Sequence, residues 1–119
     1  MIDLHTHIIH GIDDGSATLE DSTQILKEAV EAGFTDVFLT SHYLEGEYTA
    51  SKEEKNKLLK ELKEELIKEN ISINLYCGSE IYITPDIADY IEKIDTLNNS
   101  KYVLIELPMS NKISYLDDV

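Results

Sequence analysis

The sequence contains no arginine, and all ten of its basic residues are lysines. Arginine is the usual source of bidentate clamps for phosphate and carboxylate groups, because its planar guanidinium presents paired donors. Such a clamp is therefore excluded within these 119 residues. If the protein handles a phosphorylated substrate, metal ions or another stretch of polypeptide must hold the anion.

Cysteine and long apolar runs are also scarce. Cys77 is the single cysteine, so no disulfide can form within one chain, and its apolar surroundings predict a small core residue. No apolar run approaches the roughly 20 residues that cross a bilayer. The first residues carry neither a basic leader nor an apolar signal core, because Asp3, His5 and His7 interrupt them. We therefore expect a cytoplasmic protein in a reducing compartment.

Positive charge is in short supply: 24 acidic residues stand against 10 lysines, for a net charge of −14. This balance argues against a surface that binds nucleic acid or an anionic membrane. Acidic groups gathered around a site would attract divalent cations, although a solvated helix face explains much of the acidity. The length predicts a single domain over residues 1–119, or part of one.

What the chain does contain is a regular alternation of strand and helix patterns. Apolar, β-branched and aromatic runs predict strands at residues 1–4, 35–40, 71–77 and 102–107. Between them, Thr18 and Ser51 are good N-caps for helices, and Thr84-Pro85 opens a third helical stretch. The alternation predicts the α/β class, with about four parallel strands, right-handed crossovers and flanking helices.

The helical patterns also predict which side chains are buried. The apolar stripes comprise Leu19, Ile25, Leu26, Ala29 and Val30 in the first helix, and Leu58, Leu59, Leu62, Leu66 and Ile67 in the second. Gly33 is expected just after the C-cap of the first helix. On the solvent side of the second helix, Glu64 and Lys68 have the spacing of an i, i+4 ion pair.

Side chains that bind metals stand near the ends of all four predicted strands. His5 and His7 follow the first strand, and residues two apart in extended backbone point to the same side, roughly 6–7 Å apart. His42 follows the second strand, Glu80 follows the third, and Glu106 lies late in the fourth. Because the C-terminal ends of parallel strands meet at one edge, we expect these five side chains to form a metal site.

Single members of this set could also have purely structural roles. His42 could be a histidine packed at the edge of the sheet. Glu80 and Glu106 lie in apolar surroundings, where an unpaired carboxylate costs several kcal/mol. Glu106, between Ile105 and Leu107, is expected to be the more deeply buried of the two, unless a lysine or a tilt toward solvent satisfies it.

The loop after the histidine pair can bring carboxylates to the same place. Asp14 is a candidate supporting residue at a catalytic centre, as a group that orients a histidine or forms the loop rather than as a primary ligand. His10 could face a substrate or simply be exposed. Tyr43, Tyr48 and Tyr82 lie near the same edge and could line a pocket or pack on the strands. No Gly-rich nucleotide loop, nucleophile elbow or cysteine phosphatase signature is present, and residues that bind a substrate stay unassigned.

Five motifs spread along the chain allow a comparison with known families: Met1-Ile-Asp-Leu-His-Thr-His-Ile8, Gly11-Ile-Asp-Asp-Gly15, Thr40-Ser-His42, Gly78-Ser-Glu-Ile81 and residues 97–107. Together they resemble the bacterial PHP-domain (polymerase and histidinol phosphatase) protein-tyrosine phosphatases of capsule and exopolysaccharide operons. The resemblance covers essentially the whole chain. It implies the N-terminal part of a distorted seven-stranded βα barrel.

The resemblance also implies an activity. Members of this family hold up to three divalent cations, usually manganese, with iron, zinc and magnesium as alternatives. They hydrolyse phosphotyrosine on a tyrosine autokinase that regulates polysaccharide synthesis. By their motifs, His5, His7, His42, Glu80 and Glu106 correspond to metal ligands.

The chain departs from the family pattern in length. Family members are much longer, and their remaining ligands and phosphate-binding arginines come from a second half. We therefore expect the N-terminal half of such a domain, with an open sheet edge that could pair with another copy. Two alternatives stay open: a PHP phosphoesterase for a small-molecule phosphate, and an inactive fragment that binds metal or a partner.

Overall fold

The computed structural model describes residues 1–44 and 46–107. The strands are β1 (Ile2–Thr6), β2 (Asp36–Tyr43), β3 (Asn74–Tyr82) and β4 (Leu104–Glu106). The α-helices are α1 (Leu19–Glu31), α2 (Lys52–Lys68) and the short α3 (Ile87–Tyr90). Two 3₁₀ turns follow, η1 (Ile91–Lys93) and η2 (Leu97–Asn99). The unpatterned sequence tail after Pro108 lies outside the described residues.

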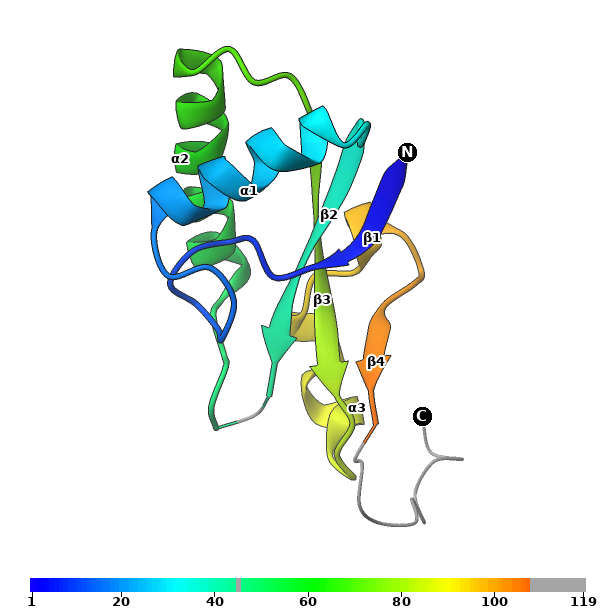
Figure 1. The fold of residues 1–119 in the computed structure, drawn as a ribbon. Coiled ribbons are helices and arrows are strands. Elements are labelled where there is room, and N and C mark those ends of the chain that lie inside the picture. Colours follow the sequence, from blue (N-terminus) through cyan, green and yellow to red (C-terminus); the bar gives the residue numbers. More distant parts are fainter. Residues whose placement is uncertain (45, 108–119) are drawn as a thin grey trace.

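The four strands form one parallel sheet in the order β1-β2-β3-β4. Helices α1 and α2 cover one face of this sheet, and α3 lies near the C-terminal end of β3 (Figure 1). The result is a curled half-barrel with flanking helices, which confirms the predicted α/β class. All four strands run in the same direction, so their C-terminal ends share one edge (Figure 1).

Both long helices begin where the sequence predicts. The Thr18 side chain accepts a hydrogen bond from the backbone N–H of Asp21, and the Ser51 side chain accepts one from Glu54. Each contact satisfies one of the N–H groups that the first turn of a helix leaves without a backbone partner. Gly33 follows the C-cap of α1 with a φ of +99°, a conformation that glycine adopts without strain.

Two apolar clusters stabilise the sheet. The larger lies between the sheet and the helices α1 and α2; its buried members are Ile8, Ile9, Leu26, Val37, Leu39, Leu62, Leu66 and Leu75. The smaller lies around α3 and comprises Ile81, Ile83, Ile87, Tyr90 and Ile94. The helical stripes are confirmed for Leu26, Leu62 and Leu66, but wrong for two isoleucines. Ile25 and Ile67 are 41% and 75% exposed, because each lies at the margin of its stripe, away from the sheet.

Three local predictions are corrected. Lys68 pairs with Glu65 rather than Glu64, with 3.8 Å between Lys68 Nζ and Glu65 Oε2. The third helical stretch begins at Ile87 and lasts four residues, after which the chain continues as the 3₁₀ turn Ile91–Lys93. The strand β3 starts at Asn74 and continues through Gly78 and Glu80, because it pairs with β2 residue by residue up to Tyr43.

The pairing of β1 with β2 contains a register shift. Asp3 lies opposite Val37, whereas Thr6 lies opposite Leu39, so β1 advances three residues while β2 advances two. The Thr6 hydroxyl donates to the backbone carbonyl of Phe38 at 2.7 Å, and its backbone N–H donates to Thr40 Oγ1 at 3.0 Å. These contacts fix β1 on its neighbour beyond the shift.

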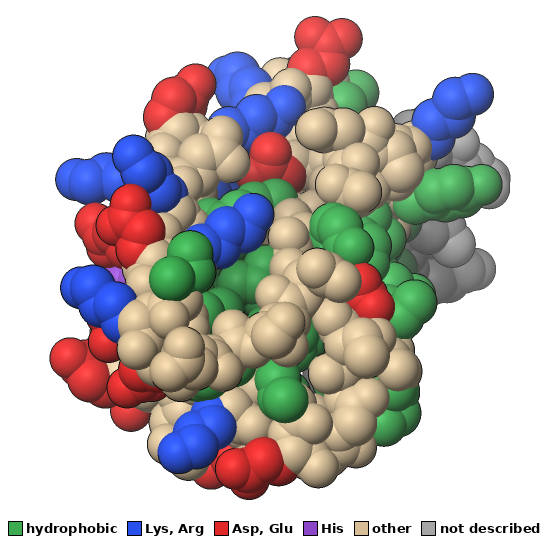
Figure 2. All heavy atoms as spheres, turned by 90° about the horizontal axis from the view of Figure 1, so that it is seen from above, with side chains coloured by type: hydrophobic (Ala, Val, Ile, Leu, Met, Phe, Trp, Pro, Cys, Tyr) green, Lys and Arg blue, Asp and Glu red, His purple; other side chains and the backbone are tan. Residues whose placement is uncertain are grey.

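The two ends of the sheet differ in character. Seen from the end where the strands begin, charged side chains crowd one side of the molecule, hydrophobic side chains lie toward the middle and the opposite side, and very little histidine is visible (Figure 2). Within the described residues, no helix has the length and apolar character needed to cross a membrane.

Cys77 is a half-buried free thiol, and burial raises its pKa.

Candidate metal centre

Three side chains meet at the C-terminal edge of the sheet: His5 of β1, His7 of the loop that follows β1, and Glu80 of β3. The Nε2 atoms of His5 and His7 lie 2.8 and 2.9 Å from Oε2 of Glu80. The two Nε2 atoms are 3.2 Å apart. Three lone-pair-bearing atoms at such distances repel one another unless a proton or a cation lies among them.

His42 extends this group across β2. Its Nδ1 lies 3.5 Å from Glu80 Oε2 and 3.3 Å from Glu106 Oε2. The position follows from the register, because His42 is paired with Glu80 in adjacent strands. The His42 ring also stacks on the His7 ring, with centroids 4.3 Å apart. The five predicted ligand residues therefore lie together at one edge.

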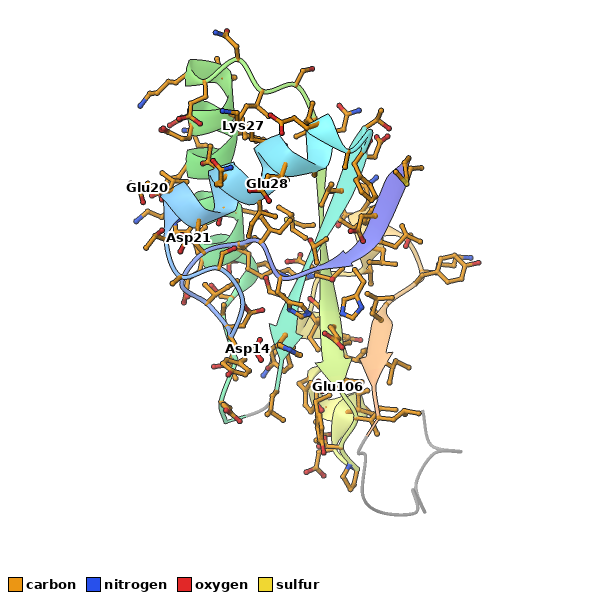
Figure 3. The ribbon with its side chains drawn as sticks, in the orientation of Figure 1. Asp14, Glu20, Asp21, Lys27, Glu28 and Glu106 are labelled. Atoms are coloured by element: carbon orange, nitrogen blue, oxygen red, sulfur yellow. The ribbon has the colours of Figure 1, made fainter. Side chains whose placement is uncertain are left out.

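The buried glutamate is Glu80 rather than Glu106. The side chain of Glu80 is 11% exposed, whereas that of Glu106 is 39% exposed. The prediction that Glu106 is more deeply buried is wrong, because β4 is three residues long and ends the sheet, which leaves Ile105 and Leu107 exposed as well. Glu106 nevertheless points toward the ends of the neighbouring strands (Figure 3).

Sequence reasoning did not assign a role to Asp13, yet its side chain is fully buried beside the cluster. Its Oδ2 lies 3.1 Å from His7 Nδ1 and accepts the backbone N–H of His42 at 2.9 Å. Its Oδ1 accepts the backbone N–H of Gly15, also at 2.9 Å. The paired aspartates of the loop were the available signal, but spacing alone cannot show which of the two turns inward.

Asp14, the predicted support, lies on the outer side of the cluster. Its Oδ1 is 3.3 Å from His42 Nε2, and its side chain is 63% exposed. Figure 3 places it at the tip of the loop between β1 and α1, near the C-terminal end of β2. It can therefore orient His42 or bind a cation together with His7 and His42, whose donor atoms are within 4.8 Å of one another and of Asp14.

The electrostatics of the loop favour a charged pair. The hydrogen bond to Asp13 is the main cause that raises the pKa of His7 above 6.5, against the opposing effect of burial. Burial alone would raise the pKa of Asp13, but hydrogen bonds from His7, His42 and Gly15 outweigh it and lower that pKa below 3.8. Asp13 is thus an ionised carboxylate that accepts the Nδ1–H of His7.

The remaining candidate residues lie around the cluster rather than in it. His10 faces α2, with its Nε2 3.6 Å from Glu61 Oε2. The ring of Tyr48 stacks on His42, at 5.8 Å between centroids, whereas Tyr43 stacks on Tyr90 in the smaller apolar cluster. Tyr82 contributes its backbone carbonyl to the Tyr90 hydroxyl at 3.5 Å. Of the three tyrosines, Tyr48 is the one in ring contact with a site histidine among the described residues.

A buried lysine braces the strand that carries Glu80. Lys55 of α2 donates to the Gly78 carbonyl at 2.6 Å and to Ser79 Oγ at 3.1 Å. Its Nζ also pairs with Asp95 Oδ2 at 3.1 Å. Leu97 packs directly against the β3 backbone at Gly78. This contact needs glycine, because a Cβ at position 78 would lie 2.6 Å from Leu97 Cδ2.

The donor set fits divalent cations. Three groups of side chains have ligand atoms within 4.8 Å of one another: His5–His7–Glu80, His42–Glu80–Glu106 and His7–Asp14–His42. Imidazole nitrogen combined with carboxylate oxygen suits manganese, iron and zinc. Fold and site together therefore define a class of protein: a parallel α/β half-barrel whose C-terminal edge carries a candidate metal centre.

Comparison with known proteins narrows this class to a family. Residues 1–119 match the family described as "Capsular polysaccharide synthesis, CpsB/CapC". The chain belongs to this family.

Named relatives agree with this assignment. The chain is 38% identical over 117 residues to the putative tyrosine-protein phosphatase CapC of Staphylococcus aureus, covering 97% of this chain and 46% of CapC. It is 31% identical to the tyrosine-protein phosphatase YwqE of Bacillus subtilis, covering 100% of this chain and 48% of YwqE. The chain therefore spans about half the length of the curated relatives it matches.

A solved structure has the same architecture. It comes from work on YwqE of Bacillus subtilis and CpsB of Streptococcus pneumoniae, described as unique metal-dependent tyrosine phosphatases. The match has a TM-score of 0.90 at 31% sequence identity and covers 99% of this chain and 49% of the other. The half-barrel is thus shared by proteins that need metal for activity.

Proposed function

We propose that this chain is a metal-dependent protein-tyrosine phosphatase domain. Its substrate would be a phosphotyrosine protein that controls capsule or exopolysaccharide synthesis, such as a bacterial tyrosine autokinase, in the cytoplasm. The observation that carries the proposal is Glu80 Oε2, a buried carboxylate oxygen that lies within 3.5 Å of nitrogens of His5, His7 and His42. The relatives named as tyrosine phosphatases support the choice of reaction.

The proposed ligands are His5, His7, His42, Glu80 and Glu106, with Asp14 as an additional support, and Mn²⁺ is the proposed ion. A bound divalent cation would supply an activated water near neutral pH and would offset the negative charge of the phosphoryl group. The side chains of this protein would hold such a cation through imidazole nitrogens and carboxylate oxygens. Glu80, like His7 and His42, belongs to two of the three ligand groups, so it would serve as a ligand in either of them.

Two features of the chain argue against a cysteine-based phosphatase. Cys77 lies inside β3 and its thiol has a raised pKa because it is buried, so it is a poor nucleophile. Its neighbours along the strand are not a phosphate-binding loop. Direct attack by water needs no such thiol, which agrees with the histidine and carboxylate cluster.

The experiment has a binding arm and a catalytic arm. Mn²⁺ binding to the purified chain is measured by calorimetry for the wild type, His5→Ala and His10→Ala. We expect His5→Ala to weaken binding and His10→Ala to leave it unchanged, because His10 faces Glu61 on α2 and lies outside the cluster. Equal binding by all three proteins would contradict the assigned ligands.

In the catalytic arm, phosphate release from a tyrosine phosphopeptide is followed with Mn²⁺, with full-length YwqE as the positive control. Release should stop on addition of a chelator and should be strongly reduced in His5→Ala. Hydrolysis that continues at full rate with the chelator would rule out the metal-dependent mechanism. A marked preference for a small phosphomonoester over the phosphopeptide would favour a small-molecule phosphoesterase.

A second candidate is a metal-binding domain without activity of its own. Two observations favour it. The chain covers 46–49% of the length of the relatives it matches, and it contains no arginine to bind phosphate. Under this alternative the wild-type chain binds Mn²⁺ through the same five side chains but releases no phosphate where YwqE does. The open edges of the sheet would then pair with another polypeptide, such as a second copy.

A further inference from the structure

We propose that Asp13 is a positioning residue that fixes the ring of His7 as its Nδ1–H tautomer and ties the loop after β1 to β2. In this arrangement the Nε2 lone pair of His7 faces Glu80 and is free to bind a cation. The inference rests on the proposed cation site, but it concerns a side chain that is not itself one of the proposed ligands.

The contacts of Asp13 link two candidate ligands from different parts of the chain. One carboxylate oxygen, Oδ2, is shared between His7 Nδ1 at 3.1 Å and the backbone N–H of His42 at 2.9 Å. Since Nδ1 of His7 carries the proton toward Asp13, the other ring nitrogen is left as the acceptor. That nitrogen, Nε2, lies 2.9 Å from Glu80 Oε2 and 3.2 Å from His5 Nε2.

Burial makes this arrangement stiff. The Asp13 side chain is 0% exposed, and its one ion pair among the described residues is with His7. A buried carboxylate without donors costs several kcal/mol, so the three N–H groups around it must stay in place for the loop to fold. Rotation of the His7 ring would remove one of those donors and is therefore opposed by the fold itself.

Gly15 allows the loop to reach this position. A Cβ at Gly15 would lie 2.1 Å from the His7 carbonyl oxygen and 2.5 Å from His7 Cβ. The next residue, Ser16, donates its backbone N–H to the same His7 carbonyl at 3.0 Å. The loop therefore holds His7 through its backbone at one point and through its ring at another.

A purely structural role for Asp13 would be to shape the loop through its contact with the Gly15 N–H. This role would leave the tautomer of His7 unaffected by the carboxylate. The two roles are separated by a measurement on the ring itself. Asp13→Asn is the informative variant, because it keeps the size of the side chain and removes the charge. Asp14→Asn is the matched control at the adjacent residue. Asp14 contacts His42, whereas the Nδ1 atom of His7 is bonded to Asp13.

The test uses the metal-free protein and long-range ¹H–¹⁵N correlation spectra of its histidines at a pH where His7 is neutral. We expect His7 as the Nδ1–H tautomer in the wild type and in Asp14→Asn, with a shift toward the Nε2–H tautomer in Asp13→Asn. An Nε2–H tautomer in the wild type would overturn the proposal, and this arm requires no variant to fold. An unchanged tautomer in a folded Asp13→Asn protein would also overturn it.

Metal affinity gives the second readout. Loss of a group that orients a metal-binding histidine weakens metal binding by about 10–100-fold. We expect a loss of this size for Mn²⁺ in Asp13→Asn, and no loss in Asp21→Asn, a conservative change in the first turn of α1. Wild-type affinity in Asp13→Asn would refute the positioning role, whereas absence of Mn²⁺ binding in the wild type would refute the proposed function and leave the tautomer result standing.

Discussion

Two carboxylates at opposite ends of the sheet show how differently this fold treats its charges. Asp36, at the start of β2, accepts hydrogen bonds from the Thr35 hydroxyl, the Asn74 amide and the Tyr76 hydroxyl at 2.6, 3.1 and 3.0 Å. Glu80, near the end of β3, faces nitrogens of His5, His7 and His42 instead. Both carboxylates lie on adjacent strands and both have three close neighbours.

The groups around each carboxylate show that Asp36 has a structural role, whereas Glu80 lies among side chains that can bind a metal ion. The hydroxyl and amide groups around Asp36 donate hydrogen bonds to it, and none of them offers a neutral imidazole nitrogen that could join the carboxylate in binding a cation. The histidines around Glu80 can exchange their protons for a metal ion, since neutral imidazole is a ligand and imidazolium is not. The difference teaches that convergence of polar groups is not enough to identify a metal site; their capacity to accept a cation decides.

The largest expected effect comes from removing the brace behind Glu80, which has no counterpart at the Asp36 end among the described residues. Replacing Lys55 with methionine leaves Asp95 as a buried charge without its partner, so the free energy of unfolding should fall by roughly 3–5 kcal/mol. Adding Asp95→Leu should recover most of that loss, because it removes the uncompensated charge. Urea denaturation measures both variants, and wild-type stability in Lys55→Met would show that the brace does not support this end.

The second effect tests the two carboxylates directly. Glu80→Gln should weaken Mn²⁺ binding by roughly 100-fold or more, because even supporting groups of metal sites contribute 10–100-fold. Asp36→Asn, at the other end of the sheet, should leave the affinity unchanged. Calorimetric titration of both variants makes the comparison. Similar losses in the two would mean that the ends do not differ in the way we infer.

The third effect is a difference in pH dependence of the metal-free protein. The lowered pKa of Asp13 adds stability that is present above about pH 3.8 and is lost as the pH falls through its folded value. The raised pKa of His7 adds stability that is present below about pH 6.5 and is lost as the pH rises through its folded value. The pair therefore contributes most between these limits.

Asp36 is the matched control for this measurement. Hydrogen bonds from Thr35, Tyr76 and Asn74 lower its pKa, so it contributes on the acid side alone. In urea midpoints measured across pH with a chelator present, Asp13→Asn should flatten both limbs of the profile. Asp36→Asn should flatten the acid limb and preserve the decline above neutrality. Identical profiles for the two variants would contradict the charged His7–Asp13 pair.

The smallest effect is expected from an apolar side chain beyond the Asp36 end. Ile67 is 75% exposed on α2, so Ile67→Lys should change the free energy of unfolding by less than about 0.5 kcal/mol. The buried Leu62 of the same helix is the control, and Leu62→Ala should cost about 2–5 kcal/mol. Urea denaturation of the two variants checks the difference. A large loss in Ile67→Lys would reveal a partner for this surface.

Much of this arrangement could be predicted from the sequence, because parallel topology converts strand ends into neighbours. The five candidate ligands come from four separate segments of the chain, yet a βα repeat predicts one shared edge for His5, His7, His42, Glu80 and Glu106. The N-caps Thr18 and Ser51 were likewise predictable, since capping depends on local side-chain chemistry.

What could not be predicted depends on three-dimensional details of loops and edges. The turn that Gly15 permits determines whether Asp13 or Asp14 points inward. The spacing of the two residues in the sequence does not predict this. The exposure of Glu106 follows from its place on the last strand of the sheet, a position that strand composition does not encode. His10 pairs with Glu61 through the packing of a helix that begins much later in the chain, at Lys52.

The register shift in β1 has a consequence for where the imidazoles can go. Side chains alternate between the two faces of a strand, and an extra residue reverses that alternation from its position onward. With even pairing throughout, His5 and His7 would match Leu39 and Ser41 and turn toward the helices. Counted from the pairing of Thr6 with Leu39, His5 falls level with Phe38 and His7 with Thr40, on the side that His42 and Glu80 share. A single irregular step in the backbone thus decides whether His5 and His7 lie beside the other candidate ligands or face the apolar core.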